Sequence, residues 1–393
     1  MTKYKLGDIC KIVSGSTPKT NVDEYWDGDI KWITPAELND DTYIITDSIR
    51  KITEIAVQKN GLTPLPEGTV ILSSRAPIGK VAIAGCKMYC NQGFKNLICS
   101  DKINNKYLYW FLKSKTSFLN SLGRGATFKE ISKSIVSEIE INVPDLAQQN
   151  KAVEIFEKVS RIIALRKQEL SALDSFTKAR FVEMFGSPIS NPFSWEKRTL
   201  KDVCVKLNDG THLSPESFNT GEYMYVTAKN IKLSGFDFSN ITYVPEEVHR
   251  PIFERCNPEL GDVLYIKDGA TTGIAMVNTL ENEFTLLSSV ALLKQDRSIM
   301  NGYFLTALLN NEEMYLDIRC NMGGAAITRL TIAKLNAIKV IVPPIELQNQ
   351  FADFVHQVDK SKVIALRNGN QLKILKSIIY TFGDTTTEPN FHV

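Results

Sequence analysis

Two long stretches of the chain carry apolar residues at alternating steps of three and four, the spacing of one helix face. The first stretch, residues 146–185, contains neither proline nor glycine and predicts a helix about 60 Å long. The second follows Pro343-Pro344. The apolar positions are Phe156, Val159, Ile163, Leu170 and Leu173 in the first stretch, and Phe354, Val358, Ala365, Leu372, Leu375, Ile379 and Phe382 in the second. This spacing is typical of a coiled-coil seam, which predicts that the two helices pack on each other. The alternative is that each helix packs on its own domain.

The segments in front of these helices predict domains of mixed secondary structure. Short runs rich in β-branched residues alternate with glycine, proline and asparagine turns. Each segment then predicts a helix, a glycine-marked stop, a short helical stretch and a strand that ends at a proline. The expected strands include residues 69–72, 139–143, 263–266 and 338–342, and the expected helices are residues 107–122 and 303–319.

The chain also repeats itself, at an offset that drifts from about 193 to 201 residues. Matching pairs follow one another in the same order over nearly the whole sequence. They are Leu6-Gly7-Asp8-Ile9-Cys10 with Leu200-Lys201-Asp202-Val203-Cys204, Trp32-Ile33-Thr34 with Tyr225-Val226-Thr227, Gly68-Thr69-Val70-Ile71-Leu72 with Gly261-Asp262-Val263-Leu264-Tyr265, Gly125-Ala126 with Gly324-Ala325, Gln149-Asn150 with Gln348-Asn349, Ile163-Ala164-Leu165-Arg166 with Ile364-Ala365-Leu366-Arg367, and Phe185-Gly186 with Phe382-Gly383. A collinear series of this kind predicts two copies of one unit.

Pattern and repeat together predict an α+β protein. Two mixed α/β domains, related by internal duplication, are separated by two long helices that form a coiled coil. The expected divisions are residues 1–145, 146–190, 191–342 and 343–393.

Composition narrows the class of protein. The chain has 393 residues, 43% of them hydrophobic, with 46 Lys and Arg against 44 Asp and Glu, so disorder is not expected. No apolar run reaches the ~18 residues of a membrane helix, and the first residues lack the apolar segment of a signal peptide. Seven cysteines without a C-x-x-C pair predict buried thiols in a reducing cytoplasm. Four histidines without an H-E-x-x-H motif predict no metal site.

Motifs for catalysis are missing from the sequence. There is no P-loop, no dinucleotide-binding glycine motif after a strand, and no nucleophile elbow. Asn191-Pro192-Phe193 lacks the second proline of the motif with which adenine methyltransferases hold a flipped base. We therefore expect the chain alone to bind no cofactor and to catalyse no reaction.

Several predicted loops combine small residues, hydrogen-bonding side chains and a cation, and they recur at matching places in both copies. Arg and Lys bind phosphate or read guanine, and Asn and Gln pair with adenine, so these loops predict a DNA-binding face. Ordinary β-turns use Gly, Ser, Asn and Asp too, so any one residue is equally compatible with a turn. The candidates are Ser14, Ser16, Thr17, Lys19, Ser74, Arg75, Lys80, Asn91, Gln92 and Lys95 in the first copy, and Asp209, Thr211, His212, Lys229, Lys267, Thr271 and Thr272 in the second.

Charge differs between the two front segments. Residues 1–145 hold 19 Lys and Arg against 16 Asp and Glu, whereas residues 191–342 hold 15 against 18. The second segment therefore needs a polarised face, or a more basic partner, if it binds DNA.

The whole arrangement resembles the specificity subunit of type I restriction–modification systems. The resemblance covers essentially the entire chain and depends on the order and duplication of short motifs. These are Asp209-Gly210-Thr211-His212 with Pro215, Gly261-Asp262-Val263-Leu264 followed by Gly273, Pro144-x-x-x-Gln148-Gln149 and Pro343-Pro344-x-x-x-Gln348 before the long helices, and Phe185-Gly186 and Phe382-Gly383 after them. The first copy departs from the pattern, with Ser14-Gly15-Ser16-Thr17-Pro18 where the second has Asp-Gly-Thr-His.

The resemblance implies that each front domain is a target recognition domain that reads one half of a split, asymmetric site in double-stranded DNA. It implies that the long helices form an antiparallel coiled coil that sets the unread spacer. Two methyltransferase subunits that use S-adenosylmethionine, and ATP-driven restriction subunits, would be the partners, and their cofactors would not bind this chain. Two other functions remain open at this point: a self-contained DNA methyltransferase or nuclease, and a repeat scaffold that does not bind DNA.

Overall fold

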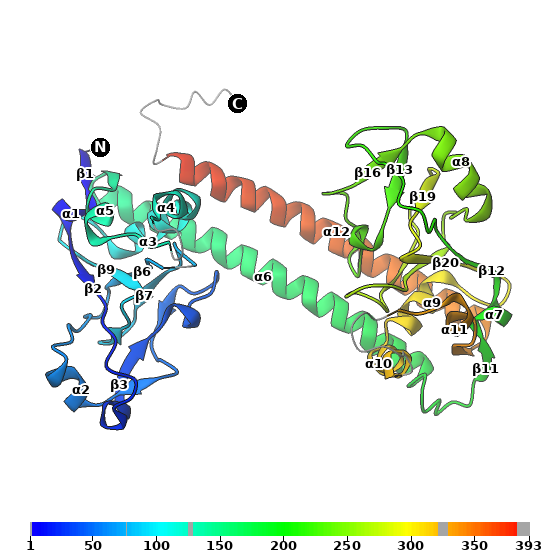
Figure 1. Ribbon diagram of the computed structural model, residues 1–393, viewed down its shortest axis with the longest axis horizontal. Coiled ribbons are helices and arrows are strands. Elements are labelled where there is room, and N and C mark those ends of the chain that lie inside the picture. Colours follow the sequence, from blue (N-terminus) through cyan, green and yellow to red (C-terminus); the bar gives the residue numbers. More distant parts are fainter. Residues whose placement is uncertain (1, 76, 125–128, 321–328, 383–393) are drawn as a thin grey trace. The chain divides into compact units, whose positions relative to one another are not determined.

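The computed structural model describes residues 2–75, 77–124, 129–320 and 329–382, the last sixteen by their backbone alone (Figure 1). Contacts divide the chain into two compact units. The first comprises Met1–Arg166 with Arg367–Val393, and the second comprises Lys167–Leu366. The predicted front segments 1–145 and 191–342 each lie inside one unit, and their boundaries stay a prediction.

The first unit is built on a five-stranded sheet with the order β2-β9-β6-β7-β4. A three-stranded sheet, β5-β3-β8, and the pair β1-β10 accompany it. The bounds of the strands are β1 Thr2–Lys5, β2 Cys10–Ser14, β3 Trp26–Ile33, β4 Ile44–Ile45, β5 Lys51–Ile52, β6 Val70–Ser73, β7 Val81–Ala84, β8 Tyr89–Cys90, β9 Phe94–Cys99 and β10 Glu140–Val143. The helices are α1 Leu6–Ile9, α2 Glu54–Lys59, α3 Asn105–Ser114, α4 Thr116–Leu122 and α5 Lys133–Ser137. Short 3-10 turns lie at Asp23–Tyr25 and Pro35–Glu37.

The second unit repeats this plan. A four-stranded sheet has the order β12-β20-β17-β18, and a three-stranded sheet has the order β16-β13-β19. The pairs β14-β15 and β11-β21 complete the strands. The bounds are β11 Glu196–Thr199, β12 Cys204–Asp209, β13 Tyr223–Val226, β14 Ile231–Lys232, β15 Gly235–Phe236, β16 Thr242–Val244, β17 Val263–Ile266, β18 Ala275–Val277, β19 Phe284–Leu286, β20 Val290–Gln295 and β21 Lys339–Val342. The helices are α7 Leu200–Val203, α8 Glu246–Arg255, α9 Gly302–Leu309, α10 Glu312–Cys320 and α11 Ile332–Asn336, with a 3-10 turn at Ala228–Asn230.

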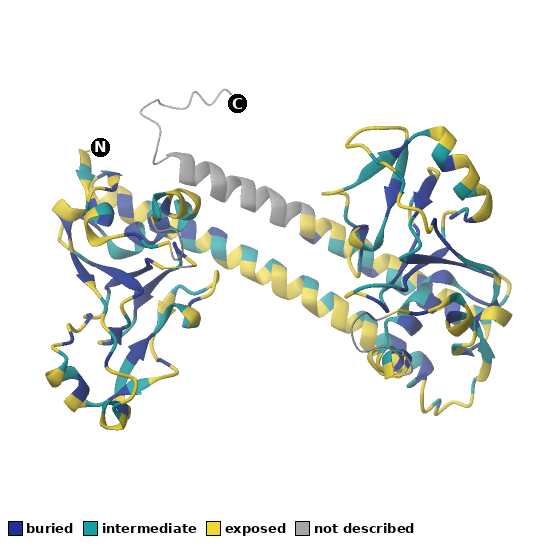
Figure 2. Ribbon diagram, viewed as in Figure 1, coloured by how far each residue is buried: buried dark blue, intermediate teal, exposed yellow. Residues whose placement is uncertain are grey.

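The central strands of the main sheets are buried along their whole length. β6, β7 and β17 expose none of their residues, because helices or other strands cover both sheet faces (Figure 2). This explains why their sequences are continuous apolar runs and not alternating ones. In the first unit α3 contacts β6 and β7, and in the second α9 contacts β17 and β18.

Two buried glutamines show how closely the copies correspond. Gln149 Oε1 accepts a hydrogen bond of 2.8 Å from the Asn104 backbone N–H. Gln348 Oε1 accepts one of 2.9 Å from the Asn301 backbone N–H. Both side chains are fully buried, and both asparagines cap a helix, α3 and α9 respectively. The repeat Gln149-Asn150 and Gln348-Asn349 therefore marks equivalent joints between each long helix and its domain.

The long helices are α6, Leu146–Phe185, and α12, Ile345–Phe382. Both ends of α6 pack on a domain, and α12 packs on the second unit through Phe351 near its start. Phe156 belongs to the core of the first unit, with its ring 5.7 Å from that of Trp110. Phe181 and Phe185 belong to the core of the second. α6 therefore packs on the domain before it and on the domain after it, and the expectation that each helix packs on its own domain does not describe α6.

Within the second unit the two helices also contact each other. The rings of Phe176 and Phe354 are 5.0 Å apart, and Lys362 Nζ lies 2.8 Å from Asp174 Oδ1. Because position 174 faces 362 while position 176 faces 354, the helices run in opposite directions here.

The predicted seam is partly visible in burial. Phe156, Val159 and Val358 are buried, and Ile163, Leu170, Leu173 and Phe354 are half-buried. Leu372, Leu375 and Ile379 lie outside the described side chains. A coiled coil over the full length of both helices stays a prediction.

The seven cysteines are unpaired, but they are not uniformly buried as the sequence predicted. Cys10, Cys90 and Cys256 are buried, whereas Cys320 is exposed at the end of α10. Burial raises the pKa of the Cys256 thiol to about 12. Among the described residues, no helix is long and apolar enough to cross a membrane, and no group of His, Cys, Asp and Glu is arranged to hold a metal ion.

Candidate nucleic-acid interface

In the first unit, three predicted loops meet at one end of the five-stranded sheet. β2 and β6 end there, and β7 and β9 begin there. The backbone N–H of Ser16 donates to the carbonyl of Cys90 at 2.9 Å, and that of Ser74 donates to the carbonyl of Gly93 at 2.7 Å. A Cβ at Gly15 would lie 1.8 Å from a carbonyl oxygen, so only glycine allows this approach. We call these segments, residues 14–19, 74–75, 77–80 and 91–95, the first loop cluster.

The second unit builds the same arrangement. The backbone N–H of Thr211 donates to the carbonyl of Leu286 at 2.8 Å, and that of Lys267 donates to the carbonyl of Ser289 at 2.9 Å. A Cβ at Gly210 would lie 1.9 Å from a carbonyl oxygen. Residues 209–213, 227–230, 267–273 and 287–289 form the second loop cluster.

These matching contacts align the two clusters position by position. Ser14 corresponds to Asp209, Ser16 to Thr211, Thr17 to His212, Ser74 to Lys267 and Lys95 to Ala291. The backbone is alike at these positions, whereas the side chains differ in size, charge and hydrogen-bonding capacity.

A buried charge network lies beneath the second loop cluster. The Lys267 side chain is 2% exposed, and its Nζ lies 3.3 Å from Asp209 Oδ2 and 2.7 Å from Asp268 Oδ2. Asp209 also faces His212 Nε2 at 3.2 Å and Arg255 Nη1 at 3.6 Å. A buried ammonium must be matched by carboxylates in this way, so the network holds the loops in one arrangement.

The first loop cluster contains a smaller network around Glu130. Lys95 Nζ lies 3.0 Å from Glu130 Oε1, and Arg75 Nε lies 2.9 Å from Glu130 Oε2. Partial burial alone would raise the pKa of Glu130, but the hydrogen bonds and charges of Lys95 and Arg75 outweigh it and lower that pKa below its ordinary value. Glu130 is therefore a carboxylate that orients both cations.

The predicted site residues fall into three groups by exposure. Exposed are Ser14, Ser16, Lys19, Arg75, Gln92, His212, Lys229 and Thr271. Half-buried are Thr17, Lys80 and Asn91. Buried are Ser74, Lys95, Asp209, Thr211, Lys267 and Thr272.

Several of the less exposed residues have intramolecular partners. Lys80 Nζ donates to the carbonyl of Leu38 at 2.5 Å, Thr272 Oγ1 to the carbonyl of Gly269 at 2.7 Å, and Thr17 Oγ1 to Gln92 Oε1. The donors of Lys80, Thr272 and Thr17, which the sequence predicted to contact DNA, are thus engaged within the protein. These contacts shape the loops.

Other charged residues of the clusters escaped the sequence analysis. Glu130, Arg255 and Arg329 reach the loops from outside the motifs, and Arg50 stacks on the ring of Trp26 with its Cζ 3.7 Å from the centroid. For Glu130 and Arg329 a signal existed, because Glu130-Ile131-Ser132 aligns with Arg329-Leu330-Thr331 in the repeat. For Arg50 and Arg255 the sequence offers no signal.

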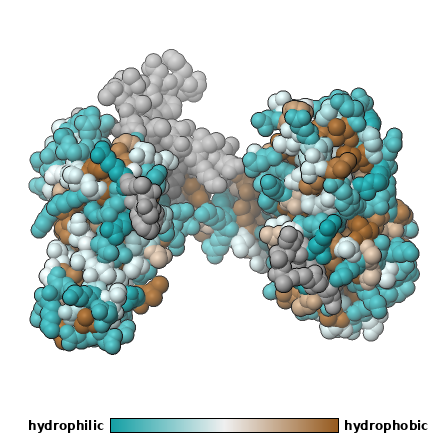
Figure 3. Space-filling view, viewed as in Figure 1, coloured by the Kyte–Doolittle hydropathy of each residue, from teal (hydrophilic) through white to brown (hydrophobic). Residues whose placement is uncertain are grey.

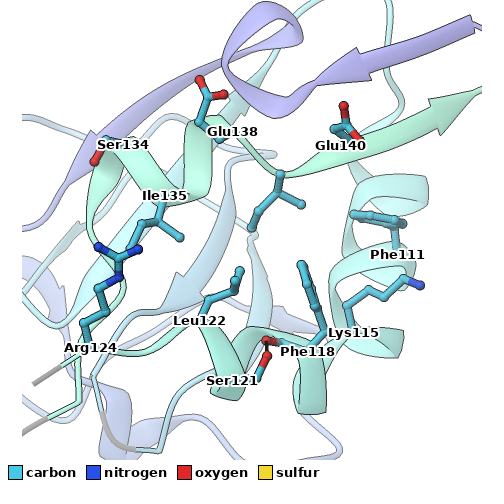
Figure 4. Close-up of a pocket in the computed structure, with 11 residues that line it drawn as sticks. Phe111, Lys115, Phe118, Ser121, Leu122, Arg124, Ser134, Ile135, Glu138 and Glu140 are labelled. Atoms are coloured by element: carbon cyan, nitrogen blue, oxygen red, sulfur yellow. Dashed lines mark hydrogen bonds between the residues drawn. The ribbon is translucent and has the colours of Figure 1, made fainter.

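A pocket of about 720 Å³ lies elsewhere in the first unit, among α3, α4, α5 and β10 (Figure 4). Phe111, Phe118 and Leu122 face its interior. Its two carboxylates are neutralised, since Glu138 pairs with Lys5 at 2.6 Å and Glu140 pairs with Lys3 at 2.5 Å. The drawn face of each unit is otherwise mainly hydrophilic, with hydrophobic side chains scattered between (Figure 3).

The sequence matches the model of a protein family described as the type I restriction modification DNA specificity domain. The match covers residues 1–175 and again residues 192–376, one copy for each half of the repeat. The chain belongs to this family. The resemblance inferred from the motifs is thus confirmed.

Characterised relatives extend along the same length. The chain is 30% identical to the type I restriction enzyme MjaIX specificity subunit of Methanocaldococcus jannaschii, over 95% of this chain and 89% of that protein. It is 24% identical to the type I restriction enzyme EcoprrI specificity subunit of Escherichia coli, over 90% of this chain and 86% of that protein.

Solved structures share the fold. The type I restriction–modification S subunit from M. genitalium superposes with a TM-score of 0.59 at 15% identity, over 96% of this chain and 94% of that chain. A chain from a structure of a type I restriction–modification system, solved to describe complex assembly and conformational transition, gives a TM-score of 0.59 at 18% identity, over 98% and 97%. The α+β architecture with two repeats is therefore the fold of this family.

Proposed function

We propose that this chain is the non-catalytic DNA specificity subunit of a type I restriction–modification complex, and that each loop cluster reads one half of a bipartite, asymmetric target. The observation that carries the proposal is the pairing of one backbone arrangement with two different sets of side chains. Ser16 and Thr211 receive the same backbone support, yet their neighbours Thr17 and His212 offer different groups to a ligand. Two readers of different sequences need this combination.

The exposed side chains are the proposed DNA contacts. In the first cluster these are Arg75 and Gln92, with Lys19 beside them; in the second they are His212 and Lys229. Arg presents donors that fit guanine, Gln fits adenine, and Lys binds phosphate. The buried residues Ser74, Lys95, Asp209, Thr211, Lys267 and Thr272 have no access to a duplex, so we assign them to positioning the loops.

The weak net charge of residues 191–342 is compatible with this assignment. Two of its cations are exposed to solvent beside the second loop cluster: the side chains of Arg255 and Arg329 are 47% and 60% exposed. A polarised face of this kind supplies phosphate contacts even where the segment as a whole is acidic.

The long helices are the proposed spacer between the two readers. The antiparallel contacts between α6 and α12 in the second unit support a coiled coil that fixes the number of unread base pairs. Two methyltransferase subunits that use S-adenosylmethionine, and ATP-driven restriction subunits, are the proposed partners. This chain would bind neither cofactor, and the complex would act on DNA in the cytoplasm.

Exchange of one reader tests the proposal. The chain is produced with the methyltransferase subunits of its own system, and methylated adenines are mapped on a plasmid library. Replacing residues 191–342 by those of a relative should change one half of the methylated motif and leave the other half and the spacer intact. Replacing residues 1–145 is the matched control and should change the other half.

Two results would contradict the proposal. A change in both half-sites after a single exchange would exclude independent readers. Methylation by the chain without its partners would indicate a self-contained enzyme.

A further inference from the structure

Each loop cluster is closed by a backbone bridge from a segment that the motifs did not include. In the first unit Arg75 pairs with Glu130 in an antiparallel bridge, and the N–H of Ile131 donates to the carbonyl of Ser74 at 2.9 Å. In the second unit Asp268 pairs with Arg329 in the same way. There the N–H of Leu330 donates to the carbonyl of Lys267, also at 2.9 Å. Arg75 thus corresponds to Asp268, and Glu130 to Arg329.

The charges on these bridges are inverted between the units. In the first, the arginine lies on the loop after β6 and the carboxylate on the bridging segment. In the second, the carboxylate lies on the loop after β17 and the arginine on the bridging segment. Both units therefore hold an exposed guanidinium at this bridge, delivered by opposite strands of it. In the first unit Glu130 also pairs through its backbone with Arg124, whose side chain is exposed as well.

Both arginines face a carboxylate through Nε, but among the described residues only Arg75 forms a hydrogen bond there, since Asp268 Oδ1 has no hydrogen-bond partner. Arg75 Nε lies 2.9 Å from Glu130 Oε2, and Arg329 Nε lies 3.4 Å from Asp268 Oδ1. In the part of the chain that the structure describes, the carboxylate contact of each arginine involves Nε, which leaves both terminal nitrogens to a ligand. Two donors on one planar group match the O6 and N7 acceptors of guanine.

Stability alone does not account for the pairs. The side chains of Arg75 and Arg329 are 45% and 60% exposed, and exposed ion pairs contribute little to the free energy of folding. Asp268 is engaged more closely by the buried Lys267, at 2.7 Å, than by Arg329. The exposed arginine is the feature that both units retain.

We infer that Arg329 is the specificity-determining arginine of the second unit, the counterpart of Arg75 in the first, and that it selects one base, guanine by its donor geometry, in the half-site of the second unit. This inference rests on the proposed function. It assigns to Arg329 a role that no sequence motif pointed to.

Methylome mapping of the complex with Arg329→Ala tests the inference. Discrimination at one position of one half-site should fall by about 5- to 150-fold, the equivalent of ~1–3 kcal/mol, with the other half-site unchanged. Arg75→Ala is the matched control and should relax one position of the opposite half-site. Arg329→Lys keeps the charge but not the paired donors, so it should lose discrimination as well.

Exchanging the two charges tests whether base selection can be restored, and not only whether it can be lost. Arg329→Glu should abolish selection at the affected position. Adding Asp268→Arg to Arg329→Glu recreates the polarity of the bridge of the first unit, while Lys267 keeps Asp209 at 3.3 Å as its carboxylate. Selection should be restored, because the guanidinium returns to this bridge from the other strand. Thermal unfolding of each variant complex verifies that the fold is intact.

Three outcomes would overturn the inference. The first is that Arg329→Ala leaves both half-sites fully selective while methylation continues. The second is that it weakens binding alike on all sequences, which indicates a phosphate contact. The third is that Arg329→Lys behaves as the parent. If the parent complex itself methylates no bipartite motif, the proposed function fails, which is a different result.

Discussion

The joints between domain and helix are alike in the two units, and the charge networks under their loops are not. The side-chain oxygens of Gln149 and Gln348 accept equivalent backbone hydrogen bonds, of 2.8 Å from Asn104 and 2.9 Å from Asn301. The buried lysines instead come from different strands. Lys95 lies on β9, where the second unit has Ala291, and Lys267 follows β17, where the first unit has Ser74. A buried ammonium under the loops is thus common to both units, while the residue that supplies it is not.

The joint and the loop cluster of each unit therefore have different structural requirements. The joint must carry a long helix at a fixed angle, which requires one geometry and buried partners. The loop cluster must offer a particular set of groups to a ligand, and its internal charges can be redistributed if each buried cation keeps a carboxylate. Asp209 and Asp268 are the carboxylate partners of Lys267, and Glu130 is the carboxylate partner of Lys95. The predictions below test whether the networks differ in strength while the joints do not.

The largest effect is expected from Lys267→Met. The substitution removes the one buried cation beside Asp209, whose side chain is 6% exposed, and leaves it only the more exposed His212 and Arg255, the latter at 3.6 Å. Breaking a buried pair in this way costs ~3–5 kcal/mol in the free energy of unfolding of the second unit. Urea unfolding followed by hydrogen exchange, which reports each unit separately, measures the loss.

Lys95→Met is the matched substitution in the first unit. Its partner Glu130 is one-third exposed and keeps Arg75, so the loss should be smaller, ~1–2 kcal/mol. Equal losses in the two units would show that the networks do not differ in strength.

A symmetric effect, between those of Lys267→Met and Lys95→Met, is expected at the joints. Gln149→Leu removes the acceptor of the Asn104 N–H, in a part-buried place, and the donor to the carbonyl of Pro144, in a buried one. Unsatisfied buried groups of this kind should reduce the free energy of unfolding of the first unit by ~2–4 kcal/mol. Gln348→Leu should do the same to the second unit, measured as above.

The neighbouring exposed residue provides the control for these variants. Gln148→Leu changes a side chain that faces solvent and should alter neither unit by more than a few tenths of a kcal/mol, that is ~0.5 or less. If Gln149→Leu and Gln348→Leu differed by more than twofold, the joints would not be equivalent.

The sequence predicted the joints well and the charge networks badly, for a physical reason. The Gln-Asn pairs, the long helix Leu146–Phe185 and the apolar central strands follow local patterns, and the repeat doubled each of these signals. Burial of Lys95 and Lys267 depends on carboxylates that approach from distant segments. Their positions in glycine-rich loops therefore indicated exposed DNA contacts, whereas the structure buries both.

The arginine bridges were hidden for a related reason. Glu130 and Arg329 occupy equivalent positions in the two units but carry opposite charges, so the two residues do not look similar in the sequence. The flanking residues Ile131-Ser132 and Leu330-Thr331 indicate the equivalence, and the backbone pairing shows that each bridge carries an arginine and a carboxylate. Prediction from side-chain identity fails wherever two copies fulfil one role with different residues.

The smallest expected effect concerns pH, and it comes from one buried side chain of the second unit. Residues 1–166 contain no histidine, whereas the second unit buries His249 completely. Its ring stacks on Tyr223 at 3.9 Å, its Nδ1 lies 2.8 Å from Thr285 Oγ1, and its Nε2 lies 3.2 Å from Glu283 Oε2. Burial lowers the pKa of His249, and the nearby Glu283 only partly opposes this shift.

A histidine whose pKa is lower in the folded than in the unfolded state favours folding most when it is neutral. The stability that it contributes is present above the unfolded pKa of ~6.5 and is lost as the pH falls through the lower folded value. Unfolding at pH 7.5 and 5.5 should therefore show a loss in the second unit. His249→Gln keeps an amide for Thr285 and removes the titration, so it should lose this pH dependence. Burial raises the pKa of Asp262, so this residue stabilises the folded state as the pH falls. Parent and variant share this contribution, so it cancels when their pH dependences are compared. A pH dependence that survives in His249→Gln would assign the effect to other groups and leave the two units alike in this respect.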